Sequence, residues 1–564
     1  MNRAEKRRQK KLAEKATRKA KPGTPATGAI GPSARPTKEA FDLALHYYNA
    51  GRLPETERTC QQTLQIDPNQ PVVLHLQGVI ARQTGKYDAS ANLINKALAI
   101  EPGYADAHHD LGLALNDLGK YEEAAQSYQR ALAIKPELAD AHYNLGNVLN
   151  RLGRLEEAAQ SYTNALANKP HFLEAFSNLG STLKDLGRLD EAVTYFDKAL
   201  DINPGFAEIH NNLGVALYDL GRHQEAAESY KKAIAIMPSF AEAHSNLGNV
   251  FKEQGNMEEA LASINKALAI KPDFADAHFN LGNVFKKLEK YEEAAKSYQK
   301  ATALKPDFAD AHYNLGIVLK ESDRLDEAVE NLKAALIILP RFEKAEHVLN
   351  SLLGNTSDCA PKNYVEDLFD PYAEKFEKHL INDLEYSAPS LIKKTLVDLG
   401  LVKGKFGKVI DLGCGTGLAG VQFADIAESL VGIDLSDNMI RKAKEKNIYT
   451  GLYVDDIVDG LENLNEKFDV FISTDVFIYI GNLLPIFKSV KKHFQKQSIF
   501  TFCTEHAQSG DFVLQKTCRY AHSKDYVESV AKTAGLQVTH SSQFDLRKEN
   551  DNWVAGGIYV LRSV

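Results

Sequence analysis

A strict period of 34 residues runs from Pro68 to Pro340 and constrains the fold more than any other feature. Three residue types keep this spacing, each in its own column. The prolines are Pro68, Pro102, Pro136, Pro170, Pro204, Pro238, Pro272, Pro306 and Pro340; the glycines are Gly78, Gly112, Gly146, Gly180, Gly214, Gly248, Gly282 and Gly316; the alanines are Ala97, Ala131, Ala165, Ala199, Ala233, Ala267, Ala301 and Ala335. Such a period is typical of a solenoid, in which each unit packs against its neighbours.

Each unit contains two apolar stretches at helical spacing that are separated by a glycine turn. One example is the stretch from Leu145 to Leu152, which is followed by Gly153 and a second stretch of the same kind. The recurring proline stands where the second helix must stop, because proline cannot continue a helix. We therefore expect nine helix pairs over residues 37–342, followed by a capping helix and linker over residues 343–361.

This 34-residue pattern resembles the tetratricopeptide repeat (TPR). The resemblance implies an α-solenoid, a right-handed superhelix in which the first helix of each pair lines a concave groove. One column on the groove side begins at Asp110 and continues as Asn144, Asn178, Asn212, Asn246, Asn280 and Asn314. An amide offers a donor and an acceptor every 34 residues, which suits an extended peptide held by its backbone. The alternative is that these asparagines cap or bridge neighbouring repeats.

The asparagine column resembles the ladder in the TPR part of O-linked N-acetylglucosamine transferases, as does the phrase at residues 308–316. We therefore predict that the groove binds a protein or peptide. An acidic column beside it, which includes Asp140 and Glu242, favours a basic or neutral ligand, although a solvated stripe explains it almost as well. A histidine column, which includes His108 and His142, is spaced too widely for metal ligands, so we predict helix packing and no metal site.

The chain carries a net charge of −8, but its first 21 residues hold ten Lys and Arg against two Glu. We expect residues 1–36 to form a basic, disordered tail and linker, without the apolar core of a secretory signal. Nucleic-acid binding is disfavoured apart from possible contacts of this tail, which an anionic membrane surface could also attract. No apolar run approaches the ~20 residues of a membrane span, and five scattered cysteines form no pair motif, so we expect a cytoplasmic protein.

Beyond residue 354 the period is lost, and strands alternate with helices. A strand over residues 408–412 ends in Asp411 and the glycine-rich turn Gly413-Cys-Gly415-Thr-Gly417. Such a turn lets the backbone approach a ligand, but its spacing departs from the dinucleotide fingerprint, which argues against NAD. The strand over residues 429–433 ends in Asp434, where a carboxylate can accept hydrogen bonds from both ribose hydroxyls of an adenosine.

The ordered set DLGCGTG (411–417), GIDLSDNM (432–439), YVDDI (453–457) and STDVFIY (473–479) resembles class I S-adenosylmethionine-dependent methyltransferases. More narrowly, residues 364–380 and 519–523 are similar to a microbial family of predicted TPR-linked methyltransferases. The resemblance implies a Rossmann-like α/β domain over residues 362–564 with a mostly parallel seven-stranded sheet. It implies that Gly413, Gly415 and Gly417 receive the methionine moiety, with Asp411 orienting its ammonium group. It further implies that Asp434 binds ribose and that Asp456 and Ile457 face adenine.

Methyl transfer is an in-line displacement, so alignment and exclusion of water matter more than a strong base. If a base is needed, the candidates are Asp475, Glu505 and His522, because each lies at or after a strand end on the ligand side of such a sheet. For each of them a purely structural role is an equal alternative. The segment 369–386, with apolar residues that include Phe369, Tyr372 and Phe376, is expected to fold over the cofactor as a lid.

The sequence thus predicts a methyltransferase that uses S-adenosylmethionine and whose TPR groove recruits a protein or peptide. One alternative is a small-molecule methyltransferase whose repeats act as an assembly scaffold. Another is a TPR adaptor without turnover. A sugar transferase is disfavoured because only about 200 residues follow the repeats, and their motifs resemble those of a methyltransferase domain.

Overall fold

The structure, a computed structural model, describes residues 34–370, 373, 376–508, 510–549 and 552–564. Nearly all of the predicted N-terminal tail therefore lies outside the described residues. The chain separates into two compact units, one ending at Pro272 and the other running from Asp273 to Val564. The second unit joins the last helix pairs of the repeat region to the α/β domain.

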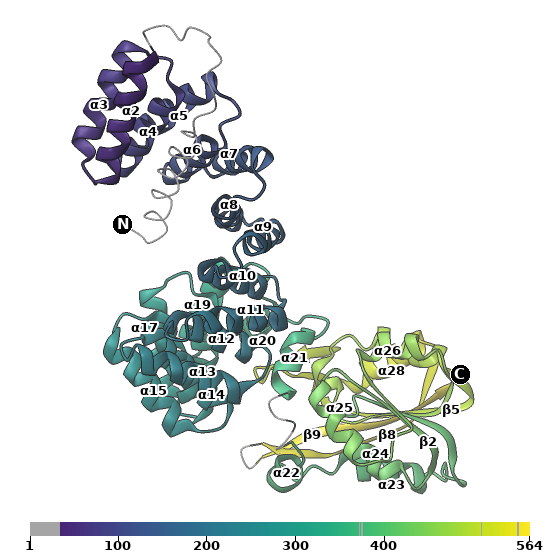
Figure 1. Cartoon of the computed structure of the whole chain (residues 1–564). Helices are drawn as coiled ribbons and strands as arrows, with labels where there is room; N and C mark the ends of the chain where they lie inside the picture. The colour runs from purple at the N-terminus through teal and green to yellow at the C-terminus, as the bar shows by residue number, and fades with distance from the viewer. Residues whose placement is uncertain (1–33, 371–372, 374–375, 509, 550–551) are drawn as a thin grey trace. The chain divides into compact units, whose positions relative to one another are not determined.

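Helices in consecutive pairs fill the repeat region in both units, as the period predicts (Figure 1). In the first unit they are α2 (Ala34–Asn49), α3 (Leu53–Ile66), α4 (Pro71–Gln83), α5 (Tyr87–Ile100), α6 (Ala105–Asp117), α7 (Tyr121–Ile134), α8 (Ala139–Arg151), α9 (Leu155–Asn168), α10 (Leu173–Asp185), α11 (Leu189–Ile202), α12 (Ala207–Asp219), α13 (His223–Ile236), α14 (Ala241–Glu253) and α15 (Met257–Ile270). In the second unit they are α16 (Ala275–Lys287), α17 (Tyr291–Leu304), α18 (Ala309–Glu321), α19 (Leu325–Ile338) and the following single helix α20 (Glu343–Leu353).

The glycine column exists because the two helices of a pair cross in close contact. A β-carbon on Gly146 would lie 2.6 Å from Cε1 of Tyr162, and one on Gly282 would lie 2.6 Å from Cε1 of Tyr298. The alanine column is fully buried at every one of its eight positions. Small side chains at these two columns therefore let a large side chain of the second helix fill the space between the helices, an aromatic ring in five of the eight pairs and Ile or Leu in the other three.

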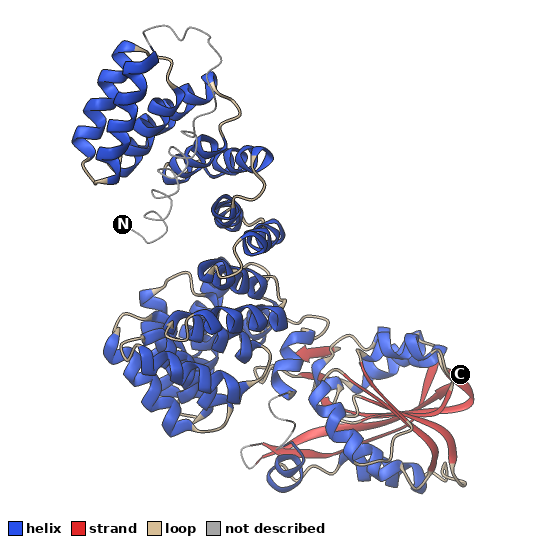
Figure 2. Ribbon diagram, viewed as in Figure 1, coloured by secondary structure: helices blue, strands red, loops and turns tan. Residues whose placement is uncertain are grey.

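The C-terminal domain is a mixed sheet with helices on both faces (Figure 2). Its strands are β1 (Phe406–Leu412), β2 (Ala427–Asp434), β3 (Gly451–Val454), β4 (Phe468–Ser473), β5 (Phe494–His506), β6 (Phe512–Leu514), β7 (Tyr520–His522), β8 (Leu536–Glu549) and β9 (Asn552–Ser563). The first five are parallel in the order β3-β2-β1-β4-β5, and β9 adds to β5 antiparallel with β8 beyond it.

The sheet has nine strands and not the seven that the sequence predicts. The two additional strands, β6 and β7, form a short antiparallel hairpin, and β7 also pairs with the end of β5 at Glu505 and His506. Each of these two strands is only three residues long. A period-2 pattern cannot be recognised over three residues, which is why the sequence did not reveal them.

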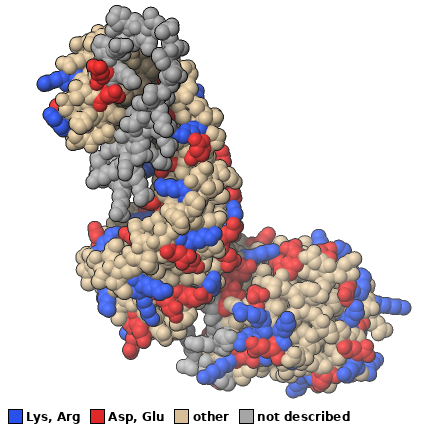
Figure 3. Space-filling view, in the orientation of Figure 1, with Lys and Arg blue, Asp and Glu red and all other residues tan. Residues whose placement is uncertain are grey.

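Two apolar cores pack the helices onto the sheet. The helices α26 (Ile457–Leu464), α27 (Leu484–Lys492) and α28 (Lys524–Thr533) cover one face, where Leu461 and Phe487 are fully buried. The helices α23 (Ala388–Asp398) and α24 (Leu418–Phe423) cover the other face through Ile392 and Phe423. Between strands β2 and β3 lies α25 (Asp437–Glu445). Acidic and basic side chains are interspersed over the visible face of this domain (Figure 3).

The hairpin β6–β7 contacts helix α20 within the second unit. The backbone oxygen of Cys518, in the hairpin loop, lies 3.2 Å from Nε2 of His347. The Cys518 thiol lies 3.3 Å from Oγ of Ser351. Within the described residues, no helix is long and apolar enough to span a bilayer.

Candidate active site

A cavity of about 610 Å³ lies at the carboxyl ends of the parallel strands. Its floor comes from the loops after β1, β2, β3 and β4, which supply Gly413, Asp434, Asp456 and Asp475. Ligands bind at this edge of open α/β sheets because the strand order reverses there, between β1 and β4. The roof comes from the segment between α20 and α23, which contains α21 (Lys362–Phe369), the short α22 (Phe376–Lys378) and the π-helical turn η1 (His379–Asp383).

The glycine-rich turn after β1 adopts a conformation that side chains would oppose. All three predicted glycines have a positive φ: 73° at Gly413, 53° at Gly415 and 91° at Gly417. A β-carbon on Gly413 would come within 2.3 Å of Cγ2 of Val476. The turn therefore requires glycine and presents its backbone at the cavity, where Gly413 and Gly415 form part of the lining.

Asp434, at the end of β2, is held by the turn after β1. Its Oδ2 accepts from the backbone N–H of Gly415 at 2.8 Å, and its Oδ1 accepts from the N–H of Ser436 at 2.9 Å. Burial raises the pKa of Asp434, whereas the two N–H groups act in the opposite direction. Each carboxylate oxygen keeps a further lone pair for a ligand hydroxyl.

Asp411, at the end of β1, is fully buried and lies outside the cavity lining. Its Oδ2 accepts from the Tyr449 hydroxyl at 2.7 Å, whereas its Oδ1 makes no hydrogen bond to any described residue. Burial raises the pKa of Asp411 to about 7. Any contact of Asp411 with a ligand therefore requires a change in this arrangement or a mediating water.

The predicted adenine-facing residues line the cavity at the start of α26. The Asp456 side chain caps this helix, because its Oδ1 accepts from the N–H of Val458 at 2.9 Å. Its Oδ2 lies 3.6 Å from Nζ of Lys362 on the roof helix α21. Ile457 is buried beside it and presents an apolar surface.

The roof contacts the domain through polar groups as well as through aromatic side chains. Phe369, Phe376 and Leu380 line the cavity, whereas Tyr372 lies outside the described residues. Asp370 accepts through its side chain from the Ser436 hydroxyl and through its backbone oxygen, at 3.1 Å, from Nδ2 of Asn438. The described residues of the predicted lid segment thus line the cavity, and Asp370 joins them to the first turn of α25.

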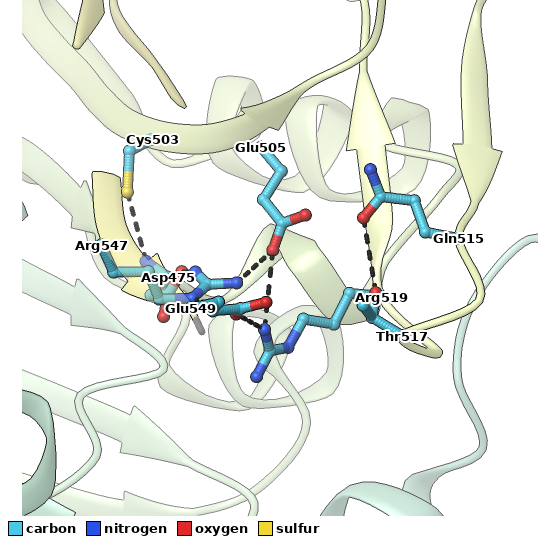
Figure 4. A network of polar contacts seen from close by, with 8 residues as sticks. All are labelled: Asp475, Cys503, Glu505, Gln515, Thr517, Arg519, Arg547 and Glu549. Carbon is cyan, nitrogen blue, oxygen red and sulfur yellow. Dashed lines mark hydrogen bonds and ion pairs between the residues drawn. The ribbon is translucent and has the colours of Figure 1, made fainter. Parts of the chain in front are cut away.

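Another part of the cavity lining, called the polar end below, is polar and surrounds Arg547 of β8 (Figure 4). Arg547 donates from Nη1 to Asp475 at 2.7 Å, from Nε to Glu549 at 2.9 Å and from Nη2 to Glu505. Burial alone would lower the pKa of Arg547, but the three carboxylates raise it above its usual value. Arg519 of the β6–β7 hairpin donates from Nη1 to the same Glu549.

The structure separates the three candidate bases. Asp475 lines the cavity and has a positive φ of 58°. Glu505 is buried outside the lining, and burial raises its pKa despite its pairing with Arg547. His522 is fully buried in β7 and also lies outside the lining, with Nε2 placed 2.8 Å from the oxygen of Ile480. Burial lowers the pKa of His522 to about 4, so it is neutral at pH 7.

Several residues that line this polar end were given no role in the predictions from the sequence. They are Tyr386 before α23, Tyr479 after β4, Arg519 and Arg547. No sequence signal marks Arg547, because strand alternation places it on the opposite face from Leu546, where a charged side chain is normally solvated. No signal marks Tyr386 either, because its position depends on the fold of the roof.

The asparagine column of the first unit joins neighbouring repeats. Nδ2 of Asn178 donates to Oδ1 of Asn147 at 2.8 Å. Nδ2 of Asn246 donates to Oδ1 of Asn211 at 3.1 Å, and Nδ2 of Asn144 lies 3.0 Å from Nε2 of His109. The bridging role that the sequence left open is therefore present. It uses the amide N–H donors of these asparagines in hydrogen bonds between neighbouring repeats.

The asparagines nevertheless border a hollow. Asn144 and Asn178 line a cavity of about 430 Å³ together with Asn147, Tyr143 and Arg151. Asn212 is half-buried in α12, and Asn280 is buried in α16. In the second unit, Asn314 donates to the Asp310 backbone oxygen at 3.0 Å and accepts from Nζ of Lys286 at 2.7 Å.

The histidine column contacts the proline turns. Nε2 of His108 lies 2.9 Å from the backbone oxygen of Pro102, and His142 and His210 repeat this contact with Pro136 and Pro204. These histidines therefore bind the backbone at the repeat boundary. Among the described residues, no cluster of His, Cys, Asp and Glu is suited to a metal ion.

The fold is an α-solenoid followed by a mostly parallel α/β domain. A glycine-rich turn and an acidic residue lie at adjacent strand ends of that domain, an arrangement typical of α/β domains that bind nucleotide-like ligands. The family model described as "Methyltransferase domain" matches residues 403–552. The model described as "TPR repeat" matches residues 112–153, 180–221, 216–255, 248–289 and 282–323, and models described as "Tetratricopeptide repeat" match residues 93–126 and 139–172. The protein carries TPR repeats and a methyltransferase domain.

Solved structures similar to this chain include three repeat proteins. YrrB, titled a TPR protein with an unusual peptide-binding site, is 27% identical over 33% of this chain and 96% of its own, with a TM-score of 0.31. MamA is 28% identical over 29% of this chain and 95% of its own, with a TM-score of 0.28. The C-terminal part of a TPR repeat-containing protein from Cytophaga hutchinsonii is 18% identical over 43% of this chain and 99% of its own, with a TM-score of 0.38. No curated protein matches the chain.

Proposed function

We propose that this protein transfers a methyl group from S-adenosylmethionine and that its TPR region recruits a protein or peptide as partner or substrate. The observation that carries the first part is the placement of Asp434. Its carboxylate stands at the end of β2, against the N–H groups of Gly415 and Ser436, on the edge of the cavity. A carboxylate in this place accepts hydrogen bonds from the hydroxyls of a ribose.

The residues present fit such a cofactor. Oγ1 of Thr416 is buried within the glycine-rich turn without a hydrogen bond to any described residue. The cofactor carries a sulfonium and an ammonium against one carboxylate, and the acids Asp434, Asp455 and Asp456 line the cavity against Lys362. Electrostatic complementarity therefore favours a ligand of net positive charge.

Each part of the site takes a defined role in this proposal. The Gly413–Gly417 turn receives the methionine moiety, Asp434 binds the ribose, and Asp456 with Ile457 faces the adenine. When bound, the cofactor supplies a methyl carbon that its sulfonium already activates. The roof residues Phe369 and Phe376 exclude water from the site. The remaining task of the protein is to align the acceptor with the methyl group.

Calorimetric titration of S-adenosylmethionine into the full-length protein tests the first part. Asp434→Ala should weaken binding roughly thirtyfold, because two lost hydroxyl contacts cost on the order of 2 kcal/mol. Asp437→Ala is a matched control three positions away, since the Asp437 side chain is 72% exposed. No binding to the wild type would refute the enzyme and leave a TPR adaptor.

The recruitment part is supported by the hollow bordered by Asn144 and Asn178 and by its arginine and tyrosine side chains. Transfer of labelled methyl groups into a cell extract tests it. Label in a protein band supports recruitment of a protein substrate. Label confined to the small-molecule fraction favours the alternative in which the repeats act as a scaffold.

A further inference from the structure

The polar end of the cavity contains hydrogen-bond donors that remain available to a ligand. The Tyr386 hydroxyl is buried and lines the cavity beside the side chain of Thr474. Arg519 lines the cavity with 28% of its side chain exposed, and its Nη1 donates to Glu549 and lies 4.0 Å from Oε1 of Glu505. A guanidinium has five N–H donors and no acceptor, so this side chain has donors left for a ligand.

The carboxylates of the same cluster are already engaged. Asp475, Glu505 and Glu549 each accept from a different nitrogen of Arg547. Arg547 is only 1% exposed, so these ion pairs are shielded from water. The donors that remain at the polar end, on Arg519 and Tyr386, can therefore bind an acceptor of hydrogen bonds on a ligand.

We propose that the methyl acceptor carries a carboxylate, which Arg519 and Tyr386 bind, and that this carboxylate is itself methylated. This inference rests on the proposed function. One carboxylate oxygen accepts from the Arg519 guanidinium and the Tyr386 hydroxyl, and the other faces the methyl group.

The chemistry of this step needs no general base. The free carboxylate oxygen forms a bond to the methyl carbon while the carbon–sulfur bond breaks, and the electron pair of that bond stays on sulfur. No proton moves, and the products are a methyl ester and S-adenosylhomocysteine. A carboxylate acceptor thus agrees with the positions of the three candidate bases, because Asp475 and Glu505 are paired with Arg547 and His522 lies outside the cavity.

The charge of the site permits an anionic acceptor once the cofactor is bound. Asp475, Glu505 and Glu549 outnumber Arg519 and Arg547 by one negative charge. The sulfonium of the bound cofactor adds a positive charge at the point where the carboxylate must attack. We therefore expect the acceptor to bind more tightly in the presence of S-adenosylmethionine than in its absence.

The chemical stability of the transferred methyl group tests the proposal. The full-length protein is incubated with tritiated S-adenosylmethionine and cell extract, and the products are treated with mild alkali. A methyl ester releases volatile methanol under these conditions, whereas methyl groups on nitrogen, on sulfur or in ethers stay attached. Alkali-stable label would overturn the proposal.

Binding of small carboxylates gives a second readout that does not depend on turnover. The complex with sinefungin, an unreactive cofactor analogue that carries a protonated amine in place of the sulfonium, is titrated with acetate, butyrate, succinate and glutarate, and with the corresponding amides as uncharged probes. We expect the tightest carboxylate to lose on the order of 10- to 100-fold in affinity in Arg519→Gln and about fivefold in Tyr386→Phe. The exposed Arg562 of β9 provides the control Arg562→Gln, which should bind as the wild type does.

These outcomes separate the inference from the function on which it rests. Arg519→Gln should keep the wild-type affinity for S-adenosylmethionine, because Arg519 bonds to Glu549, whereas Asp434 is held by Gly415 and Ser436. Absence of saturable carboxylate binding to the wild type would overturn the inference while cofactor binding persists. Loss of cofactor binding in the wild type would refute the proposed function instead.

Discussion

Arg547 of β8 donates from Nη1 to Oδ1 of Asp475 over 2.7 Å, although 72 residues separate them in the sequence. The pair joins the antiparallel end of the sheet to the loop after β4. It holds Asp475 at a positive φ of 58° on the cavity wall. The strand β8 therefore contributes a side chain to the cavity wall, in addition to its place in the antiparallel part of the sheet.

Replacing Arg547 by Met should destabilise the fold strongly. The change leaves Asp475, Glu505 and Glu549 close together without their shared cation, and breaking a buried ion pair in this way costs about 3–5 kcal/mol. Urea denaturation followed by circular dichroism measures the loss. Arg562→Met is the matched control on the exposed side of β9 and should change the free energy of unfolding by less than about 0.5 kcal/mol. Equal effects of the two changes would contradict the role of the buried network.

Asp411 should make stability fall as the pH rises from about 4 to 7. Its folded-state pKa is raised to about 7 from 3.8, so the folded state holds the proton more tightly than the unfolded state. Stability is therefore lost as pH rises through this window, by up to about 4 kcal/mol, and stays level above it. Asp411→Asn keeps an acceptor for Tyr449 and removes the titration. The free energy of unfolding of the variant, relative to wild type, should therefore be larger at pH 8 than at pH 5, and a pH-independent difference would contradict this account.

The double substitution Asn144→Ala and Asn178→Ala should weaken peptide binding by the TPR region. Both side chains line the hollow in the first unit, and their side-chain oxygens can accept from a peptide N–H. Peptides selected from a random library on the wild type should lose on the order of tenfold in affinity, as measured by fluorescence anisotropy. The control pair Gln160→Ala and Asn168→Ala changes exposed positions of α9. If the control weakens binding as much, the groove does not hold the peptide through these asparagines.

Replacing Glu289 by Gly should stabilise the repeat region. The turn between the helices of a pair uses a positive φ, which is 74° at Gly153 and 57° at Glu289. A residue with a β-carbon is strained there by about 1–2 kcal/mol, and the greater freedom of glycine in the unfolded chain offsets part of this gain. We expect a net gain of about 0.5 kcal/mol in urea denaturation. The reciprocal change Gly153→Ala meets no atom within 4 Å, so it should cost about 1 kcal/mol through the backbone alone.

Much of the fold and part of the site could be predicted from the sequence. The 34-residue columns predict the helix pairs because each column reports one recurring contact, such as Gly146 against the ring of Tyr162. The Gly413–Gly417 turn and Asp434 lie at adjacent strand ends, and the order of the strands brings them to one edge of the sheet. Local patterns suffice for these features because they depend on short-range periodicity and on the geometry of parallel strands.

The residue columns and strand-end motifs were enough to predict the solenoid, the α/β domain and the part of the cavity formed by the glycine-rich turn and Asp434. The tertiary structure was needed to place the polar end, where Tyr386, Arg519 and Arg547 come from three distant segments. It also showed that Glu505 forms an ion pair with Arg547 and that His522 is buried outside the cavity lining. The physical reason is that a buried charge must find its partners wherever the fold places them, and no local sequence pattern records a pairing between distant strands.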